Sequence, residues 1–437
     1  MTGIEIGAFA IAALILLIVL GMPIGLGMIV VSFVGVSFIR NETVAMRMIG
    51  AVANDSLREY LYAVVPLFVL MGLLVTASGV GKDTFDVFER LLRRVRAGLG
   101  IATVFANAVF ASITGISIAS ASVFSRIAVP EMVRHGYRRR FATGVVAGSS
   151  VLGMLIPPSL LMIVYAVLAE ESVGRMFLAG IGPGLLLSVL FSITILLMAY
   201  LSPKSVFDRE PDLIHQDPVS ALALAGKGVP IVVLVTLVLG GLYGGFLNPT
   251  EAGAVGALGA LAIALLRRSL TRGRFWSLLV ETGQVTVSVL FLIMAATFFS
   301  RMLAMSGLPN ALAETLLQST IGPYGFLLIF LVLVIVMGFL IDSISIMLIL
   351  LPIALPVAKA AGFDLIWFGV LTVVAVEIGL LTPPFGLSVY TIKSALGDRT
   401  LKVGEIFMGA TPFVFAMIAA LAIIIAFPPI AVWLARL

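Results

Sequence analysis

The chain has no cysteine and only two histidines, His135 and His215. Disulfides and thiolate metal sites are therefore excluded, and a zinc enzyme is not expected because zinc ligands are mostly cysteine and histidine. Both histidines fall in polar loops, where we expect them to be solvated. The sequence also lacks a G-x-x-x-x-G-K-[ST] motif, which argues against ATP-driven work. No nucleophile–base pair indicates an enzyme.

Charge is scarce as well. Charged residues make up 11% of the chain, whereas 61% is hydrophobic and the mean hydropathy is +1.20. Several apolar runs exceed the roughly 20 residues that cross a bilayer. We therefore expect an all-α polytopic membrane protein without a separate soluble domain. Residues 1–5 carry no basic segment, so no cleaved signal peptide is expected.

The apolar runs predict a set of continuous spans and two interrupted stretches. Spans are predicted at 4–20, 22–39, 60–78, 141–168, 177–201, 228–247, 250–266, 280–305, 365–392 and 405–434. Two further apolar stretches, 99–132 and 322–358, each carry polar residues in the middle.

The 27 lysines and arginines are distributed unequally between the loops on the two sides. Most lie in loops that the positive-inside rule assigns to the cytoplasm, and both termini then face outward. This topology requires 99–132 to enter and leave from the cytoplasm and 322–358 to enter and leave from outside. Both stretches are therefore predicted to be re-entrant hairpins, of opposite sense.

An internal repeat supports this topology. The double proline Pro157–Pro158 recurs 226 positions later as Pro383–Pro384. The same offset relates further pairs: Pro23 and Pro249, Gly27 and Gly253, Ser117 and Ser343, Pro130 and Pro356, and Gly153 and Gly379. With hairpins of opposite sense, the halves form an inverted repeat about an axis in the membrane plane, as in secondary transporters.

Each repeat is predicted to contain scaffold spans, a surface helix, a hairpin and a broken helix. Scaffold spans and a surface helix (83–96) occupy 1–98, and the first hairpin and broken helix occupy 99–202. A cytoplasmic loop covers 203–227. Scaffold spans and a surface helix (310–319) fill 228–321, and the second hairpin and broken helix fill 322–437.

The predicted site combines hairpin tips with helix breaks. A double proline removes two N–H donors and frees carbonyls, which survive at membrane depth only inside protein or against a polar cavity. Carbonyls and hydroxyls at helix C-termini bind Na⁺, and helix N-termini bind carboxylates. One tip and one break therefore predict one cation site, two in all, with the substrate between them.

The candidate residues follow from this arrangement. Candidate cation ligands are Ser112, Gly115, Ser117, Gly148, Ser149, Gly153, Ile156 and Pro157 in the first repeat, and Asp342, Ser343, Glu377, Gly379, Thr382 and Pro383 in the second. Candidate substrate contacts are Thr114, Ser117, Ser120, Arg126, Ser343 and Ser345.

Each type of candidate has an alternative role. A single hydroxyl can simply satisfy the backbone or join helices. Asp342 and Glu377 can help bind a cation, carry a proton or serve as buried hydrogen-bonded acids. Arg126 can contact an anionic substrate or extend to the cytoplasmic surface. Ile116 and Ile118, in the first tip, either narrow the substrate cavity or pack against a neighbour.

These motifs resemble the large membrane subunit of the tripartite ATP-independent periplasmic (TRAP) transporters. The resemblance is carried by FASITGISIASASVFSRIAVPEM (110–132), the segment 148–184 around the first double proline, NPTEAGAVGAL (248–258) and IGLLTPPFGLSVY (378–390). It implies cation sites at Ser117, Gly148 and Pro157, and at Ser343, Gly379 and Pro383.

The resemblance also implies a setting and a mechanism. We expect an inner-membrane subunit with periplasmic termini that works with a small four-helix membrane subunit and a soluble periplasmic binding protein. Import would be Na⁺-coupled, would carry organic acids and would proceed by an elevator motion. Because the first span begins soon after Met1, we expect the small subunit to be a separate chain.

Other functions stay open at this point. A stand-alone Na⁺/carboxylate symporter of similar fold would need no partners. A proton-coupled antiporter would depend on Asp342 or Glu377 and not on Na⁺. A channel or scaffold would give flux without saturation, or none.

Overall fold

The computed structural model describes residues 1–209, 221–318, 320–384 and 386–436. His215, Ser319 and most of the loop predicted at 203–227 lie outside these ranges. Eight of the described helices are long and apolar enough to cross a membrane. The described residues form no strand, only one bridge between Tyr137 and Phe207. The all-α polytopic prediction is confirmed.

The first half of the chain ends with α12. Its elements are α1 (Gly3–Val19), α2 (Ile24–Ile39), α3 (Glu42–Arg58), the 3-10 turn η1 (Tyr60–Ala63), α4 (Val64–Ser78), α5 (Val80–Leu92), α6 (Gly98–Thr114), α7 (Ser117–Arg134), α8 (Arg139–Ser150), α9 (Leu152–Leu155), α10 (Leu160–Ala169), α11 (Val173–Leu201) and α12 (Pro203–Val206).

The second half begins at α13. Its elements are α13 (Ala221–Val235), the π-helical turn η2 (Thr236–Gly240), α14 (Gly241–Tyr243), α15 (Pro249–Leu266), α16 (Arg272–Ser306), α17 (Leu308–Gln318), α18 (Gly322–Gly338), α19 (Ser343–Ala360), α20 (Leu365–Leu381), α21 (Leu387–Leu396), α22 (Val403–Ala426), α23 (Pro429–Val432) and η3 (Leu434–Arg436).

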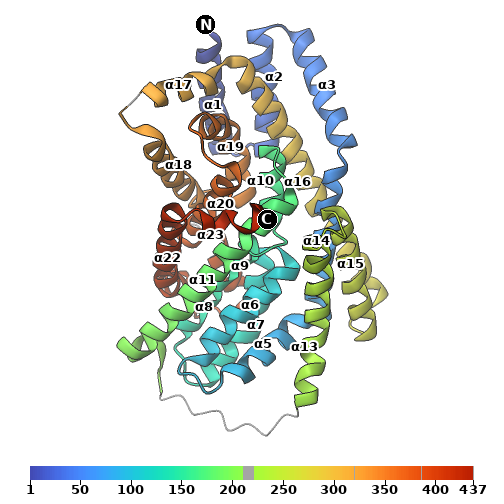
Figure 1. Cartoon of the computed structure of the whole chain (residues 1–437), viewed down its shortest axis with the longest axis vertical. Helices are drawn as coiled ribbons and strands as arrows, with labels where there is room; N and C mark the ends of the chain where they lie inside the picture. The colour runs from blue at the N-terminus through green and yellow to red at the C-terminus, as the bar shows by residue number, and fades with distance from the viewer. Residues whose placement is uncertain (210–220, 319, 385, 437) are drawn as a thin grey trace.

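Helix boundaries recur at the offset of 226. α7 runs from 117 to 134 and α19 from 343 to 360, while α8 and α9 together run from 139 to 155 and α20 from 365 to 381. Figure 1 shows α5, α6 and α7 toward one end of the long axis, and α17, α18 and α19 toward the other end. The halves therefore share an element order and place corresponding elements at different ends.

Several elements differ from the sequence prediction. No helix was predicted where α3 lies, because its charged residues lower the hydropathy of the segment. α3 is an amphipathic helix, and the Asn41 side chain caps it by accepting a hydrogen bond from Val44 N. α16 begins at Arg272 rather than 280, since Thr271 caps it. α13 already begins at Ala221. The first surface helix starts earlier than predicted, directly after Gly79, and ends at Leu92.

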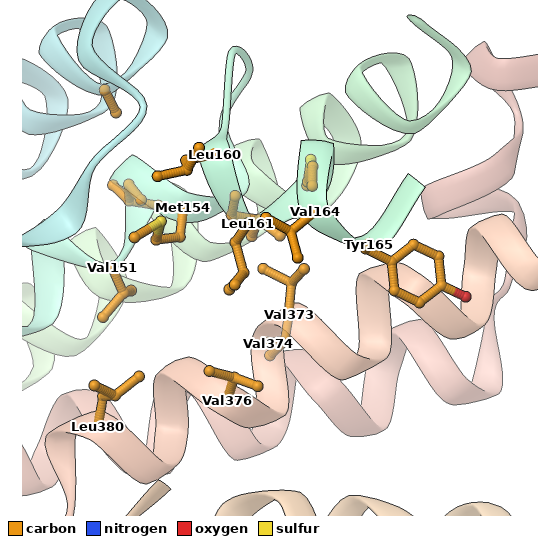
Figure 2. Packing of buried hydrophobic residues seen from close by; sticks show 14 of the residues in the cluster. Val151, Met154, Leu160, Leu161, Val164, Tyr165, Val373, Val374, Val376 and Leu380 are labelled. Atoms are coloured by element: carbon orange, nitrogen blue, oxygen red, sulfur yellow. The ribbon is translucent and has the colours of Figure 1, made fainter. Parts of the chain in front are cut away.

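The interrupted helices form the centre of the molecule. Every residue of α20 from Ile366 to Leu381 is buried, as is every residue from Phe141 to Leu155 in α8 and α9. A helix that is buried on all sides is held by contacts with the neighbouring helices rather than by lipid or water. Figure 2 shows apolar side chains of α10, among them Leu161 and Val164, facing Val373 and Val374 of α20.

Candidate functional site

The tip of the first hairpin is a two-residue turn, Gly115–Ile116, between α6 and α7. Gly115 has φ +65° and lies so close to the first break that an added Cβ would stand 2.4 Å from the Pro158 carbonyl oxygen. Its own carbonyl accepts a hydrogen bond from Leu160 N at 3.2 Å. A Cβ on Gly153 would meet Ser117 N at 3.1 Å. The first tip and the first break are therefore in direct contact, as predicted.

The first break comprises residues 156–159, and its Pro157–Pro158 peptide bond is cis. α9 ends at Leu155 and α10 begins after the cap residue Ser159. The Ser159 hydroxyl donates to the Met154 carbonyl at 2.5 Å and accepts from Met162 N at 3.3 Å. The serine thus joins the two half-helices across the prolines.

The second hairpin has a longer tip, residues 339–342, between α18 and α19. Asp342 caps α19: its carboxylate accepts from Ser345 N at 3.1 Å and from Ser345 Oγ at 2.5 Å. At the end of α18, Gly338 lies against Gly379 of α20. A Cβ on Gly379 would stand 2.7 Å from the Gly338 Cα. This hairpin is therefore packed against the broken helix by backbone contact.

A cavity of about 370 Å³ lies where the second tip meets the second break. It is lined by Gly338, Phe339, Leu340, Ile341, Asp342, Gly386 and Leu387. The break follows α20 at Thr382, and its Pro383–Pro384 bond is cis. Both repeats thus place a hairpin tip beside a proline break.

Several of the predicted hydroxyls, Ser149 among them, donate to a carbonyl one turn earlier in the chain. Ser112 donates to Val109, Thr114 to Phe110 and Thr382 to Ile378, at 2.7 to 2.9 Å. Such bonds engage the hydroxyl proton and leave oxygen lone pairs. Their roles as ligands stay predictions.

Other predicted residues are placed as follows. Ser343 is 8% exposed, and Ile156 is half-buried. A Cβ on Gly148 would meet the Phe413 side chain at 2.6 Å, so Gly148 lets α8 approach α22. In the first tip, Ile118 is 44% exposed.

Two charged candidates differ sharply in environment. Glu377 is 2% exposed, and neither carboxylate oxygen has a hydrogen-bond partner among the described residues. Arg126 is exposed on α7. A buried carboxylate without a partner is costly and is a functional candidate by default. The role of Arg126 stays a prediction.

Sequence reasoning missed Asn107. It is fully buried in α6, donates from Nδ2 to Ser149 Oγ at 2.6 Å and accepts from Ser120 Oγ. The available signal was an asparagine inside an apolar run, since such residues are rare at membrane depth and join helices there.

The two broken helices are also held together at their ends. Arg139, at the start of α8, pairs with Asp398 beyond α21 at 2.5 Å. Hydrogen bonds from Thr400 lower the pKa of Asp398, and Arg139 contributes to the shift. In the core, Tyr165 of α10 donates its hydroxyl to the Leu365 carbonyl at 2.5 Å.

Helix N-termini, which carry a partial positive charge, and helix C-termini, which carry a partial negative charge, both lie at the hairpin tips and proline breaks. α7, α10, α19 and α21 begin at the tips and breaks, while α6, α9, α18 and α20 end there. Free N–H groups and a partial positive charge at N-termini favour anions, and carbonyls at C-termini favour cations. The arrangement is therefore suited to holding an anionic group and monovalent cations together.

Half-helices and hairpins around a central site define the class of secondary membrane transporters. Residues 11–430 match the family model of the tripartite ATP-independent periplasmic transporter, DctM component. The chain belongs to this family of large TRAP membrane subunits, as its motifs indicated.

Curated relatives support that assignment, and one solved structure shares the fold. The chain is 33% identical to the C4-dicarboxylate TRAP transporter large permease protein DctM of Pseudomonas aeruginosa, over 86% of each chain. It is 31% identical to the sialic acid TRAP transporter large permease protein SiaM of Vibrio cholerae, over 93% of each. The YdaH transporter of Alcanivorax borkumensis has a similar fold, with a TM-score of 0.55 and 15% identity over 84% of this chain and 87% of that one.

Proposed function

We propose that this chain is the large membrane subunit of a Na⁺-coupled TRAP importer of an organic acid, located in the inner membrane with periplasmic termini. The observation that carries the proposal is the contact of each hairpin tip with a proline break, in a chain of this family. The tip–break contacts supply backbone carbonyls and hydroxyls, which are the ligands that Na⁺ takes in such transporters.

The moving part comprises the two hairpins and the two broken helices. Apolar packing between α10 and α20 supports this division, as do the Tyr165–Leu365 hydrogen bond and the Arg139–Asp398 ion pair. The scaffold comprises α1 to α4 and α13 to α16. In an elevator motion within an inverted repeat, the central unit moves as one body and carries ions and substrate across.

The substrate is proposed to be an organic acid. The named relatives transport C4-dicarboxylates and sialic acid. Two helix N-termini at the tips and breaks, those of α7 and α21, have no side-chain cap among the described residues and provide N–H donors for a carboxylate. The proposed partners are a small membrane subunit and a periplasmic binding protein. The isethionate TRAP permease DctMQ of Oleidesulfovibrio alaskensis, of which this chain covers 65%, is consistent with a small subunit fused in that relative.

Reconstitution tests the requirement for partners. The purified chain alone in liposomes, under an inward Na⁺ gradient, is expected not to accumulate radiolabelled C4-dicarboxylates, sialic acid or 2-oxo acids. Adding the small subunit and the cognate binding protein should start uptake, and replacing Na⁺ with choline should stop it. Accumulation by the lone chain would instead identify a stand-alone symporter.

Glu377 provides the observation that favours the alternative, a proton-coupled antiporter, because its buried carboxylate lacks a described partner. Under Na⁺ coupling, the isosteric variant Glu377→Gln is expected to keep its Na⁺ requirement and the wild-type pH profile between pH 6 and 8. Uptake rates measured across that range, with and without Na⁺, check this. Na⁺-independent wild-type uptake whose pH dependence vanishes in the variant would favour proton coupling.

A further inference from the structure

A directed chain of hydrogen bonds crosses the first hairpin. Ser120 Oγ on α7 donates to Asn107 Oδ1, and Asn107 Nδ2 on α6 donates to Ser149 Oγ on α8 at 2.6 Å. Ser149 Oγ in turn donates to the Val145 carbonyl at 2.7 Å. All three side chains are fully buried. One amide therefore ties both arms of the hairpin to the helix that precedes the first break.

This direction determines what each hydroxyl can still do. A serine hydroxyl has one proton and two lone pairs. The Ser120 proton is committed to Asn107, and no described residue donates to Ser120 Oγ. The oxygen therefore offers lone pairs, which suit a cation and not a carboxylate. Ser120 also lies one turn from Ser117, on the same side of α7.

The second repeat lacks this network. The residues 226 positions later are Leu333, Ile346 and Ala375, all apolar. The second arm of the second hairpin, α19 (343–360), nevertheless has the same length and position in its repeat as α7 (117–134) in the first repeat. Because polar side chains are costly to bury and apolar ones serve the same fold, the first repeat has a reason other than folding to keep them.

We propose that Asn107 is a positioning residue of the first ion site. It holds the hydroxyls of Ser120 and Ser149 so that Ser120 Oγ presents lone pairs to a monovalent cation, and Ser120 serves the ion rather than the substrate. This inference rests on the proposed Na⁺-coupled function. It also makes the two ion sites chemically different, because the positions of Asp342 and Glu377 in the second repeat correspond to Ile116 and Val151 in the first.

The test compares Asn107→Leu, Ser120→Ala and the double variant with Thr103→Val in the full three-component system. Thr103 is a matched control: it is fully buried on the same helix, and among the described residues its hydroxyl bonds only to Leu99 of its own helix. Asn107→Leu and Ser120→Ala are each expected to raise the Na⁺ concentration for half-maximal uptake about tenfold, since a hydrogen-bonded ligand position is lost. The substrate KM at saturating Na⁺ should stay within about twofold of wild type.

A coupled pair has a recognisable signature. Because both residues act through one bond, the double variant should be no worse than the more impaired single variant. Na⁺-dependent thermal stabilisation of each purified chain, relative to choline, gives a second readout. It should shrink in Asn107→Leu and persist in Thr103→Val.

The outcomes are separable. If wild type shows neither Na⁺-driven uptake nor Na⁺-dependent stabilisation, the proposed coupling fails and this inference fails with it. If wild type responds to Na⁺ and Asn107→Leu responds equally, only the role of Asn107 is refuted. If Asn107→Leu loses equal stability in Na⁺ and in choline and its Na⁺ requirement is unchanged, Asn107 has a structural role only.

Discussion

Gly379→Ala is expected to abolish uptake in the reconstituted system, with a loss of more than about 100-fold. The added methyl group would stand 2.6 Å from the Ile335 carbonyl oxygen and 2.7 Å from the Gly338 Cα. Both neighbours are backbone atoms, so no side chain can rotate away and α18 must separate from α20. The second hairpin then loses its contact with the break. Initial uptake rates, normalised to the amount of inserted protein, measure the effect.

Gly283→Ala is the matched control. Gly283 lies within α16, is exposed, and has no atom within 4 Å of an added Cβ. The same substitution there should leave uptake within about twofold of wild type, since alanine is a better helix former than glycine. Wild-type uptake by Gly379→Ala would contradict the close contact between α18 and α20.

Ser117→Leu and Ser343→Leu are each expected to abolish Na⁺-driven uptake while leaving expression intact. The two serines begin the second arms of the two hairpins and are 3% and 8% exposed. A leucine at either position removes an oxygen and fills space at a tip that already packs closely against a break. Na⁺-dependent uptake in proteoliposomes, alongside protein levels in the membrane fraction, checks both variants.

The control for these variants is Thr411→Leu on α22. Thr411 is exposed, and its hydroxyl donates to the Phe407 carbonyl one turn earlier and to no other residue that the structure describes. Because an exposed position has room for a leucine and loses no contact with another helix, this variant should transport normally. Uptake by Ser117→Leu or Ser343→Leu at the rate of Thr411→Leu would place the ion sites elsewhere.

Much of the architecture could be predicted because a double proline interrupts a helix and is easily recognised in the sequence. The positions of the two breaks were predicted from Pro157–Pro158 and Pro383–Pro384. The positions of the hairpin tips were predicted from the polar residues near Ser117 and Asp342. The all-α fold and the family were predicted correctly. The opposite orientation of the repeats, the domain limits and the individual ion ligands stay predictions.

What escaped prediction depends on contacts between distant segments. The approach of Gly338 to Gly379 and the link from Asn107 to Ser149 join residues that are 41 and 42 positions apart, and hydropathy carries no information about either. α3 was missed for another reason. Its run of Arg47, Asn54, Asp55 and Arg58 resembles a loop, although Ala45 and Val52 give it a buried side.

The length of α16 has a consequence for how the protein sits in its surroundings. Its 35 residues, at about 1.5 Å each, make a rod of about 52 Å, whereas the hydrocarbon layer is only about 30 Å thick. The rod must therefore lean steeply or protrude. The matching stretch of the first half is divided between α3 and α4 at Glu59, so it has a joint where α16 has none. α3 and α4 pack against α16, so a divided helix pair and an unbroken helix lie side by side in this part of the molecule. α3 and α4, with 17 and 15 residues, are each shorter than the hydrocarbon layer is thick, and only α16 exceeds it.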